Sequence, residues 1–262
     1  MPPVIPSAAL SSSAASGGLR FLPLSFPSLS IRRRRKPSML SPPPLRYSSS
    51  PPPPPPPGED SSPSRKPWLL VGLGNPGKIY QGTRHNVGFE MLDAIAEAEG
   101  ISMSSIKFKA IFGKGFIGNV PIMLAKPQTF MNASGESVGS LVSYFHIPLN
   151  QVLLMYDDMD LPFAKLRMLP KGGHGGHNGM RSVIKHLKDS RDFPRLKIGI
   201  GRPPGKMDPV NFVLRPFNKK EKEELDFTFQ RGMEALRILV LEGFSKSATF
   251  ANSATPSELL NR

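Results

Sequence analysis

One histidine in this sequence is placed where a catalytic base would be expected. His85 follows a glycine-rich turn and precedes a stretch with helical spacing, a position in which active sites often lie. Imidazole titrates near neutral pH and is the commonest general base. A base needs an orienting partner at its second ring nitrogen, and Asp157 and Asp158, at the end of a predicted strand, are the natural candidates. A lone histidine is more often structural, so that interpretation stays open.

A second glycine-rich segment contains two histidines. Residues 172–179 read Gly-Gly-His-Gly-Gly-His-Asn-Gly. His174 and His177 could suggest a metal, but no third ligand at helical spacing and no cysteine supports zinc, so we expect no metal. The glycines instead favour backbone that a ligand approaches closely. Asn178, at a predicted helix start, would face free amides that favour an anion or a carbonyl oxygen, with simple N-capping as the alternative.

Two further asparagines follow predicted strands. Residues 72–77, G-L-G-N-P-G, match the G-x-G-x-x-G pattern of dinucleotide sites. We disfavour that function because Pro76-Gly77 makes a turn where the pattern needs the start of a helix. The glycines more simply aim Asn75 into a cleft at the carboxyl end of the strand. Asn132, after a later strand, can both donate to and accept from an amide or ester, and Phe130 beside it would form an apolar wall or pack in the core.

The elements that would position these side chains alternate between strands and helices. Apolar or alternating runs predict strands at 68–71, 107–126 (two strands joined at Gly118-Asn119), 152–156 and 196–200. Helical spacing predicts helices after Asn86, across 138–145, from Asn178 to Lys188 and across 225–240, the last helix. This alternation implies an α/β domain with a largely parallel, buried sheet.

The beginning of the chain differs in composition from the rest. Residues 1–67 hold 18 of the 30 prolines, two of the 20 acidic residues, the basic block 32–36 and seven consecutive prolines at 51–57. A Ser-rich, Arg-bearing segment that is poor in acids is typical of an organellar transit peptide, here with a Pro/Ser-rich linker that we expect to be disordered. A basic tail that binds RNA is the alternative. The clustered arginines favour the chloroplast, with the mitochondrion, or both organelles, as alternatives.

The remainder, residues 68–262, fits a single globular domain with a net charge of +7 out of the chain's +14. That excess favours a nucleic-acid partner, although solubility alone could explain it. The absence of cysteine excludes disulfides, thiolate zinc sites, iron–sulfur clusters and a cysteine nucleophile. No apolar run approaches the ~20 residues of a spanning helix, so we expect no membrane association. We also expect a monomer.

Several motifs, in order, resemble those of the bacterial-type peptidyl-tRNA hydrolase family. They are G-L-G-N-P-G with Tyr80, T-R-H-N at 83–86, K-P-x-T-F-M-N-x-S-G at 126–135, Asp157 to Asp160, and G-G-H-G-G-H-N-G at 172–179. The likeness runs from about Trp68 to Phe250. The resemblance implies a single α/β domain with a mixed, mostly parallel sheet and helices on both sides. It also implies hydrolysis of the ester between a peptide and the 3′ end of tRNA, without metal or cofactor.

The resemblance also assigns roles to individual residues. The family's catalytic histidine falls on His85 and its orienting carboxylate on Asp157, and its substrate-contacting residues fall on Asn75, Tyr80, Asn132 and Asn178. The family's phosphate-clamp pair, a lysine and an arginine, falls on Leu169 and Lys197, which is a departure. Arg167 and Lys171 flank the changed position and would substitute for the missing lysine in holding tRNA phosphates.

A relative of this family in plant organelles suggests a second function. It resembles the hydrolase but facilitates group II intron splicing through a protein partner. The intact set of His85, Asp157 and the three asparagines favours the enzyme, and a splicing cofactor is the alternative. A surface apolar patch would favour the cofactor, because such patches mark protein partners.

Overall fold

The computed structural model describes residues 66–254. The segment predicted as transit peptide and linker, residues 1–67, lies outside this range except for its last two residues. Within the described range, no helix combines the length and the apolar character needed to cross a membrane.

Seven strands form one mixed sheet in the order β2-β3-β4-β1-β5-β7-β6. Their bounds are β1 (Trp68–Gly72), β2 (Ser105–Lys107), β3 (Ala110–Ile117), β4 (Val120–Pro127), β5 (Val152–Asp158), β6 (Leu166–Leu169) and β7 (Arg195–Gly199). The four central strands β4, β1, β5 and β7 run parallel to one another. Antiparallel partners complete the two edges. The predicted single α/β domain with a mixed sheet is confirmed.

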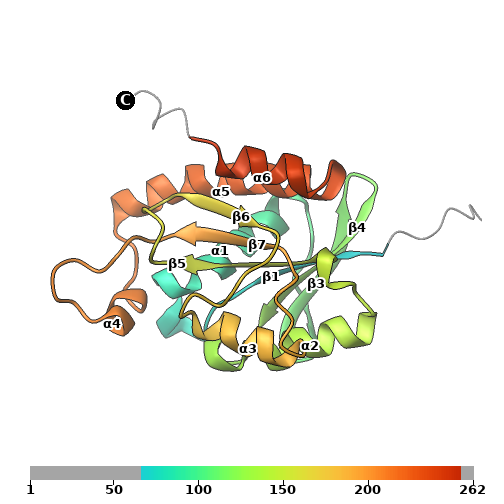
Figure 1. The fold of residues 1–262 in the computed structure, drawn as a ribbon, viewed down its shortest axis with the longest axis horizontal. Coiled ribbons are helices and arrows are strands. Elements are labelled where there is room, and N and C mark those ends of the chain that lie inside the picture. Colours follow the sequence, from blue (N-terminus) through green and yellow to red (C-terminus); the bar gives the residue numbers. More distant parts are fainter. Residues whose placement is uncertain (1–65, 255–262) are drawn as a thin grey trace, which may run out of the picture. The chain divides into compact units, whose positions relative to one another are not determined.

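Helices cover both faces of this sheet (Figure 1). Their bounds are α1 (Val87–Ala98), α2 (Ser134–Phe145), α3 (Asn178–His186), α4 (Pro209–Val213), α5 (Lys219–Leu241) and α6 (Phe244–Asn252). One buried cluster joins the sheet to α1, α5 and α6, and a second joins it to α2 and α3. The predicted arrangement of helices on both sides is therefore correct.

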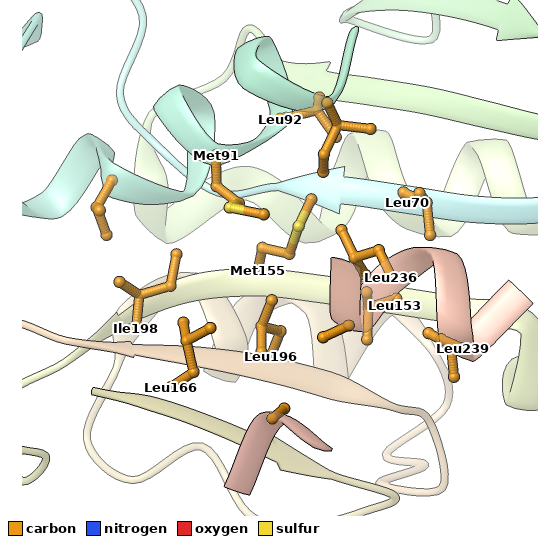
Figure 2. Packing of buried hydrophobic residues seen from close by; sticks show 14 of the residues in the cluster. Leu70, Met91, Leu92, Leu153, Met155, Leu166, Leu196, Ile198, Leu236 and Leu239 are labelled. Atoms are coloured by element: carbon orange, nitrogen blue, oxygen red, sulfur yellow. The ribbon is translucent and has the colours of Figure 1, made fainter. Parts of the chain in front are cut away.

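The central strands are nearly continuous apolar runs because both of their faces are buried. Along β5, Leu153 and Met155 pack with Leu70, Leu196 and the helices α1 and α5 (Figure 2). The alternate positions of the same strand enter the cluster on the opposite face. Because side chains alternate in this way, the position of a residue along the strand determines the face of the sheet toward which its side chain projects.

The sequence patterns did not predict two strands and two α-helices: β2, β6, α4 and α6. Three of them have five residues or fewer, which is too short for a periodic pattern to emerge. The fourth, α6, begins after Gly243, whose φ of 100° breaks the long helix α5. The predicted third helix ends at His186, before Lys188, which has a positive φ of 58°.

Two glycines let the start of α1 press onto the sheet. A Cβ on Gly72 would lie 2.2 Å from the carbonyl oxygen of Gly88, and a Cβ on Gly88 would lie 2.3 Å from that of Met155. Because neither position tolerates a side chain, the turn before α1 is held close to the carboxyl ends of β1 and β5. The G-x-G-x-x-G motif itself opens no α-helix, since α1 begins only at Val87. The turn at Pro76-Gly77 therefore does not supply the helix start that a dinucleotide site needs.

Candidate active site

His85 and Asp157 are in contact at the carboxyl end of the sheet. His85 lies in a 3₁₀ turn (Arg84–Asn86) before α1, and Asp157 lies near the end of β5. The His85 Nδ1 atom is 2.9 Å and 3.0 Å from the two carboxylate oxygens of Asp157. The neighbouring Asp158 instead forms an ion pair with Lys197, at 2.7 Å. The structure thus pairs His85 with the carboxylate that was expected.

The environment of this pair sets the protonation of both groups. Burial acts to lower the pKa of His85, but the negative charge of Asp157 and the hydrogen bond to it outweigh burial and raise that pKa above its ordinary value. An ionised carboxylate only accepts hydrogen bonds, so Nδ1–H donates to Asp157. The Nε2 atom is then left unprotonated in the neutral ring. This is the tautomer that a general base requires.

His177 is a second donor to Asp157, which sequence reasoning missed. Its Nδ1 accepts a hydrogen bond from the Met180 backbone N–H at 3.2 Å, so its Nε2 carries the proton and donates to Asp157 Oδ1 at 3.0 Å. Burial acts to raise the pKa of Asp157, but the charges and hydrogen bonds of the two histidines hold it well below its usual range. The sequence suggested His177 only as a possible metal ligand, because nothing near it in the sequence indicates a contact with Asp157 on β5.

The same three side chains form a cluster with the composition of a metal site. One ligand atom each from His85, Asp157 and His177 lies within 4.8 Å of the others. The nitrogens that face Asp157 are hydrogen-bond donors in the network just described, so a cation there would have to displace their protons. The observed contacts therefore fit a proton-bearing network, and the expected absence of a metal stays a prediction.

A cavity of about 550 Å³ surrounds the His85–Asp157 pair. Seven of the site residues predicted from the sequence line it: Asn75, His85, Phe130, Asn132, Asp157, Asn178 and Lys197. Phe130 is 61% exposed, so it forms a wall of the cavity and does not pack in the core. Four apolar or proline residues of α4 and the residue after it also line the cavity, and no pattern in the sequence indicated them: Pro209, Val210, Val213 and Leu214.

The asparagines of the cavity are held by different partners. Asn75 Oδ1 accepts from the Met131 backbone N–H at 2.7 Å. The buried Asn86 side chain bonds both the backbone N–H and the carbonyl of Asn75, at 2.8 Å and 2.9 Å. Asn178 Oδ1 accepts from Arg181 Nη1 at 3.0 Å. The N-cap of α3 is His177, so the alternative role of Asn178 as the cap is wrong.

Three other predicted site residues lie away from this cavity in the described part of the chain. Tyr80 is in the 3₁₀ turn Lys78–Tyr80, where its carbonyl accepts from Thr83 Oγ1, and it is not part of the cavity wall. Arg167 on β6 is in register with Lys197 on β7 and is exposed. Lys171 is exposed at the start of the glycine-rich loop. Arg167 is therefore the strand neighbour of Lys197, which lines the cavity, whereas Lys171 leads into the loop whose residues 174–178 line it.

A buried arginine anchors the glycine-rich loop. Arg195 is fully buried on β7 and donates to the carbonyls of Gly172 and Gly173, at 2.6 Å and 3.1 Å. Its second amino group donates to the carbonyls of Arg191 and Phe193. Because carbonyl oxygens accept from both of its amino groups, the charge is tolerated in the interior. Arg195 thereby fixes the loop that carries His177 and Asn178.

The model of the peptidyl-tRNA hydrolase family matches residues 69–258. The chain belongs to the peptidyl-tRNA hydrolase family. It is 80% identical over 197 residues to the mitochondrial peptidyl-tRNA hydrolase of Oryza sativa subsp. japonica, covering 75% of this chain and 79% of that protein. It is 74% identical over 201 residues to the chloroplastic peptidyl-tRNA hydrolase of Arabidopsis thaliana, covering 77% and 70%.

Members with other names and solved structures also match. A chloroplastic group IIB intron splicing facilitator of Zea mays is 55% identical over 181 residues, covering 69% of this chain and 71% of that protein. The crystal structure of the peptidyl-tRNA hydrolase from Acinetobacter baumannii superposes with a TM-score of 0.69 at 34% identity, covering 73% of this chain and 97% of that one. The chain is thus similar to proteins named as peptidyl-tRNA hydrolases and to one named as a splicing facilitator.

Two substitutions of His177 distinguish its hydrogen bond to Asp157 from its role as the N-cap of α3. His177→Asn and His177→Ala both remove the donor to Asp157, and we expect each to lower kcat by ~10-fold, the effect of losing ~1.4 kcal/mol from one hydrogen bond to a charged group. Asparagine is a good N-cap, so the alanine variant should be less stable than the asparagine variant by ~1 kcal/mol. Steady-state kinetics and urea unfolding measure the two effects. An unchanged kcat in both variants would show that Asp157 does not need this donor.

Proposed function

We propose that this protein hydrolyses the ester bond of peptidyl-tRNA and releases free tRNA for organellar translation, with His85 as the general base. The observation that carries the proposal is the contact of His85 Nδ1 with Asp157 inside a cavity lined by three asparagines. Two organellar peptidyl-tRNA hydrolases that are 80% and 74% identical to the chain support it.

The chemistry follows from the tautomer of His85. Its Nε2 takes a proton from a water molecule, whose oxygen attacks the carbonyl carbon of the ester. The tetrahedral intermediate then expels the tRNA 3′ oxygen, which takes the proton back from the His85 imidazolium, and the peptide is left with a free carboxyl group. A positioned base contributes ~10²–10⁴-fold to such a step. An asparagine amide N–H directed at the developing oxyanion would add ~10²–10³-fold, as one such donor does in comparable sites.

The tRNA would be held beside the cavity by basic side chains. Arg167, Lys171 and Lys197 lie toward the β7–β6 end of the sheet, where phosphate contacts would need no sequence preference. Arg167 and Lys171 would replace the lysine that is absent at Leu169. The domain would bind as a monomer, with residues 68–262 forming the catalytic part.

Turnover of a peptidyl-tRNA in the presence of a chelator tests the proposal and the absence of a metal together. We expect the protein to release tRNA from N-acetyl-aminoacyl-tRNA at the same rate with and without EDTA, because Asp157 is already satisfied by two N–H donors. Magnesium is restored to the tRNA before the assay as a control for its folding. Activity that is lost in EDTA and returns with zinc would mean that the cluster of His85, Asp157 and His177 holds a metal.

A splicing cofactor is the second candidate, and two observations favour it. Relatives at 54–55% identity are named chloroplastic group IIB intron splicing facilitators. On the surface, the rings of Phe108 and Tyr144 pack together at 4.8 Å, with Tyr144 61% exposed. Such apolar surface suits a protein partner. Binding of peptidyl-tRNA without turnover would favour this candidate.

We also propose that residues 1–67 direct the protein to an organelle, with the chloroplast as first choice. Support comes from the acid-poor, Ser- and Pro-rich composition, and from relatives named chloroplastic and mitochondrial. A fluorescent reporter fused to residues 1–66 should enter chloroplasts, and the chain without these residues should fold and remain active. A reporter that stays in the cytosol would contradict targeting, and a purely mitochondrial one would contradict the choice of organelle.

A further inference from the structure

One wall of the cavity around His85 comes from a short helix at the edge of the domain. The α4 helix, Pro209–Val213, lies beyond the carboxyl ends of β5 and β7, apart from the helices that cover the sheet (Figure 1). Its cavity-lining side chains, with that of the next residue, are Pro209, Val210, Val213 and Leu214. A helix this short is not stable by itself, so contacts with the rest of the domain must fix its position.

The backbone around the catalytic turn supplies part of that support. Residues 82–84, immediately before His85, pair with residues 215–217, which follow α4. The pairing consists of backbone hydrogen bonds of 3.0 Å and 3.1 Å and one antiparallel bridge. These contacts join the segment after α4 to the turn that carries His85, and they end before α4 itself.

The Arg84 side chain extends this support to α4. Its Nη1 donates to the carbonyls of Arg215 and Pro216, at 3.2 Å and 2.9 Å. Its guanidinium carbon lies 4.7 Å from the centre of the Phe212 ring and 5.0 Å from that of the Phe217 ring. Because Phe212 is the buried residue of α4, the cation contacts the inner face of the helix, opposite the residues that line the cavity.

The charge of Arg84 is balanced by the start of α5. Its Nη2 lies 2.5 Å from Oε1 of Glu221, and the Arg84 side chain is 9% exposed. The other carboxylate oxygen of Glu221 accepts from the Asn218 N–H at 2.7 Å, as part of the capping box of α5. A cation this deeply buried needs such a partner, and a planar guanidinium can serve carbonyls, a carboxylate and aromatic rings together. Arg84 therefore joins the turn of His85, α4 and α5.

The Arg84 side chain takes no direct part in the reaction. His85, the next residue, lines the cavity and contacts Asp157, whereas Arg84 is not among the described residues of the cavity wall. We infer that Arg84 is a positioning residue for peptidyl-tRNA hydrolysis, which holds the apolar wall of α4 at the distance from His85 that substrate binding requires. The inference rests on the proposed hydrolase function and extends it beyond the residues that line the cavity.

Substitutions of Arg84 and of its partner test the inference. Arg84→Met keeps an unbranched apolar side chain but removes the donors to both carbonyls. Glu221→Gln removes the charge that faces Arg84 and keeps a side chain that can complete the capping box. Arg237→Met is the matched control, because Arg237 forms a similar ion pair with Glu99, at 2.8 Å, and is not a residue of the cavity wall in the described range.

Each full-length variant is assayed for kcat and KM on N-acetyl-aminoacyl-tRNA, and hydrogen exchange of residues 210–214 is followed by mass spectrometry. We expect Arg84→Met to raise KM by about 10-fold with kcat nearly unchanged, because contacts made equally in the ground and transition states affect binding alone. Exchange should become faster in the same variant. Glu221→Gln should show smaller changes in the same direction, and Arg237→Met should show neither.

An unchanged KM in Arg84→Met would overturn the inference, as would a rise that Arg237→Met shares. A fall in kcat with KM unchanged would also overturn it, since a smaller folded fraction has that effect. If Arg84→Met does not fold, the same two readouts in Glu221→Gln decide. A wild-type protein that releases no tRNA would contradict the hydrolase function and with it the inference, whereas turnover with an unchanged KM in the variants removes the role of Arg84 alone.

Discussion

Replacing His85 with alanine should abolish turnover of peptidyl-tRNA while leaving the fold and tRNA affinity nearly unchanged. The loss of a positioned base costs ~10²–10⁴-fold. The fold should survive because Asp157 keeps its hydrogen bond from His177, so no buried carboxylate is left without a donor. Affinity for tRNA should survive because Arg167 and Lys171 are not among the residues that line the cavity with His85.

Single-turnover kinetics, tRNA binding and thermal unfolding of the His85→Ala protein measure the three quantities separately. Near-normal turnover would remove His85 as the base. A loss of activity that is accompanied by a large fall in melting temperature would show that the residue is structural, the alternative that its sequence left open.

Replacing Asp157 with asparagine should slow turnover by ~10³–10⁴-fold, close to the effect of the equivalent change in a hydrolase triad. An asparagine amide can present an N–H to His85 Nδ1, which would then have to accept. The ring proton would move to Nε2, and the ring could no longer take a proton from water. We expect Asp158→Asn to raise KM more than it lowers kcat, because Asp158 pairs with Lys197 and does not touch His85.

The pH dependence of kcat/KM tests the same role of Asp157, because the pKa of His85 sets the position of the acidic limb. His85 acts as a base only when neutral, so activity rises with pH through its pKa. Asp157 raises that pKa above the ordinary value of 6.5, so the acidic limb of the wild-type profile should lie above pH 6.5. In Asp157→Asn the charge is gone while burial remains, so the residual activity should show its limb at a lower pH. Equal losses in kcat for Asp157→Asn and Asp158→Asn would contradict the assignment of the orienting role.

The parts of the fold that sequence predicted well are those with long, uniform patterns. The strands around Leu70 and Leu153 are nearly continuous apolar runs because both faces of the sheet are covered, and Asp157 comes directly after such a run. His85 was found because its turn, its following helix and its chemistry all point to one function. These signals are local, so one sequence contains them.

The parts that were missed depend on contacts between distant segments. Asn86 supports Asn75 through two hydrogen bonds to its backbone, and His177 reaches Asp157 across 20 residues. Arg195 reads as an ordinary basic residue of a strand until the carbonyls of the glycine-rich loop are seen to converge on it. Such roles belong to the tertiary arrangement and leave no periodic trace in the chain.

The fate of oxygen during turnover tests the central claim most directly. Peptidyl-tRNA is incubated with the protein in water enriched in a heavy oxygen isotope, and both products are examined by mass spectrometry. Attack of a water activated by His85 on the carbonyl carbon predicts one heavy oxygen in the peptide carboxylate and none in the tRNA, at a rate that His85→Ala abolishes. Label in the tRNA 3′ hydroxyl, or peptidyl-tRNA that stays intact with the wild-type protein, would contradict the account.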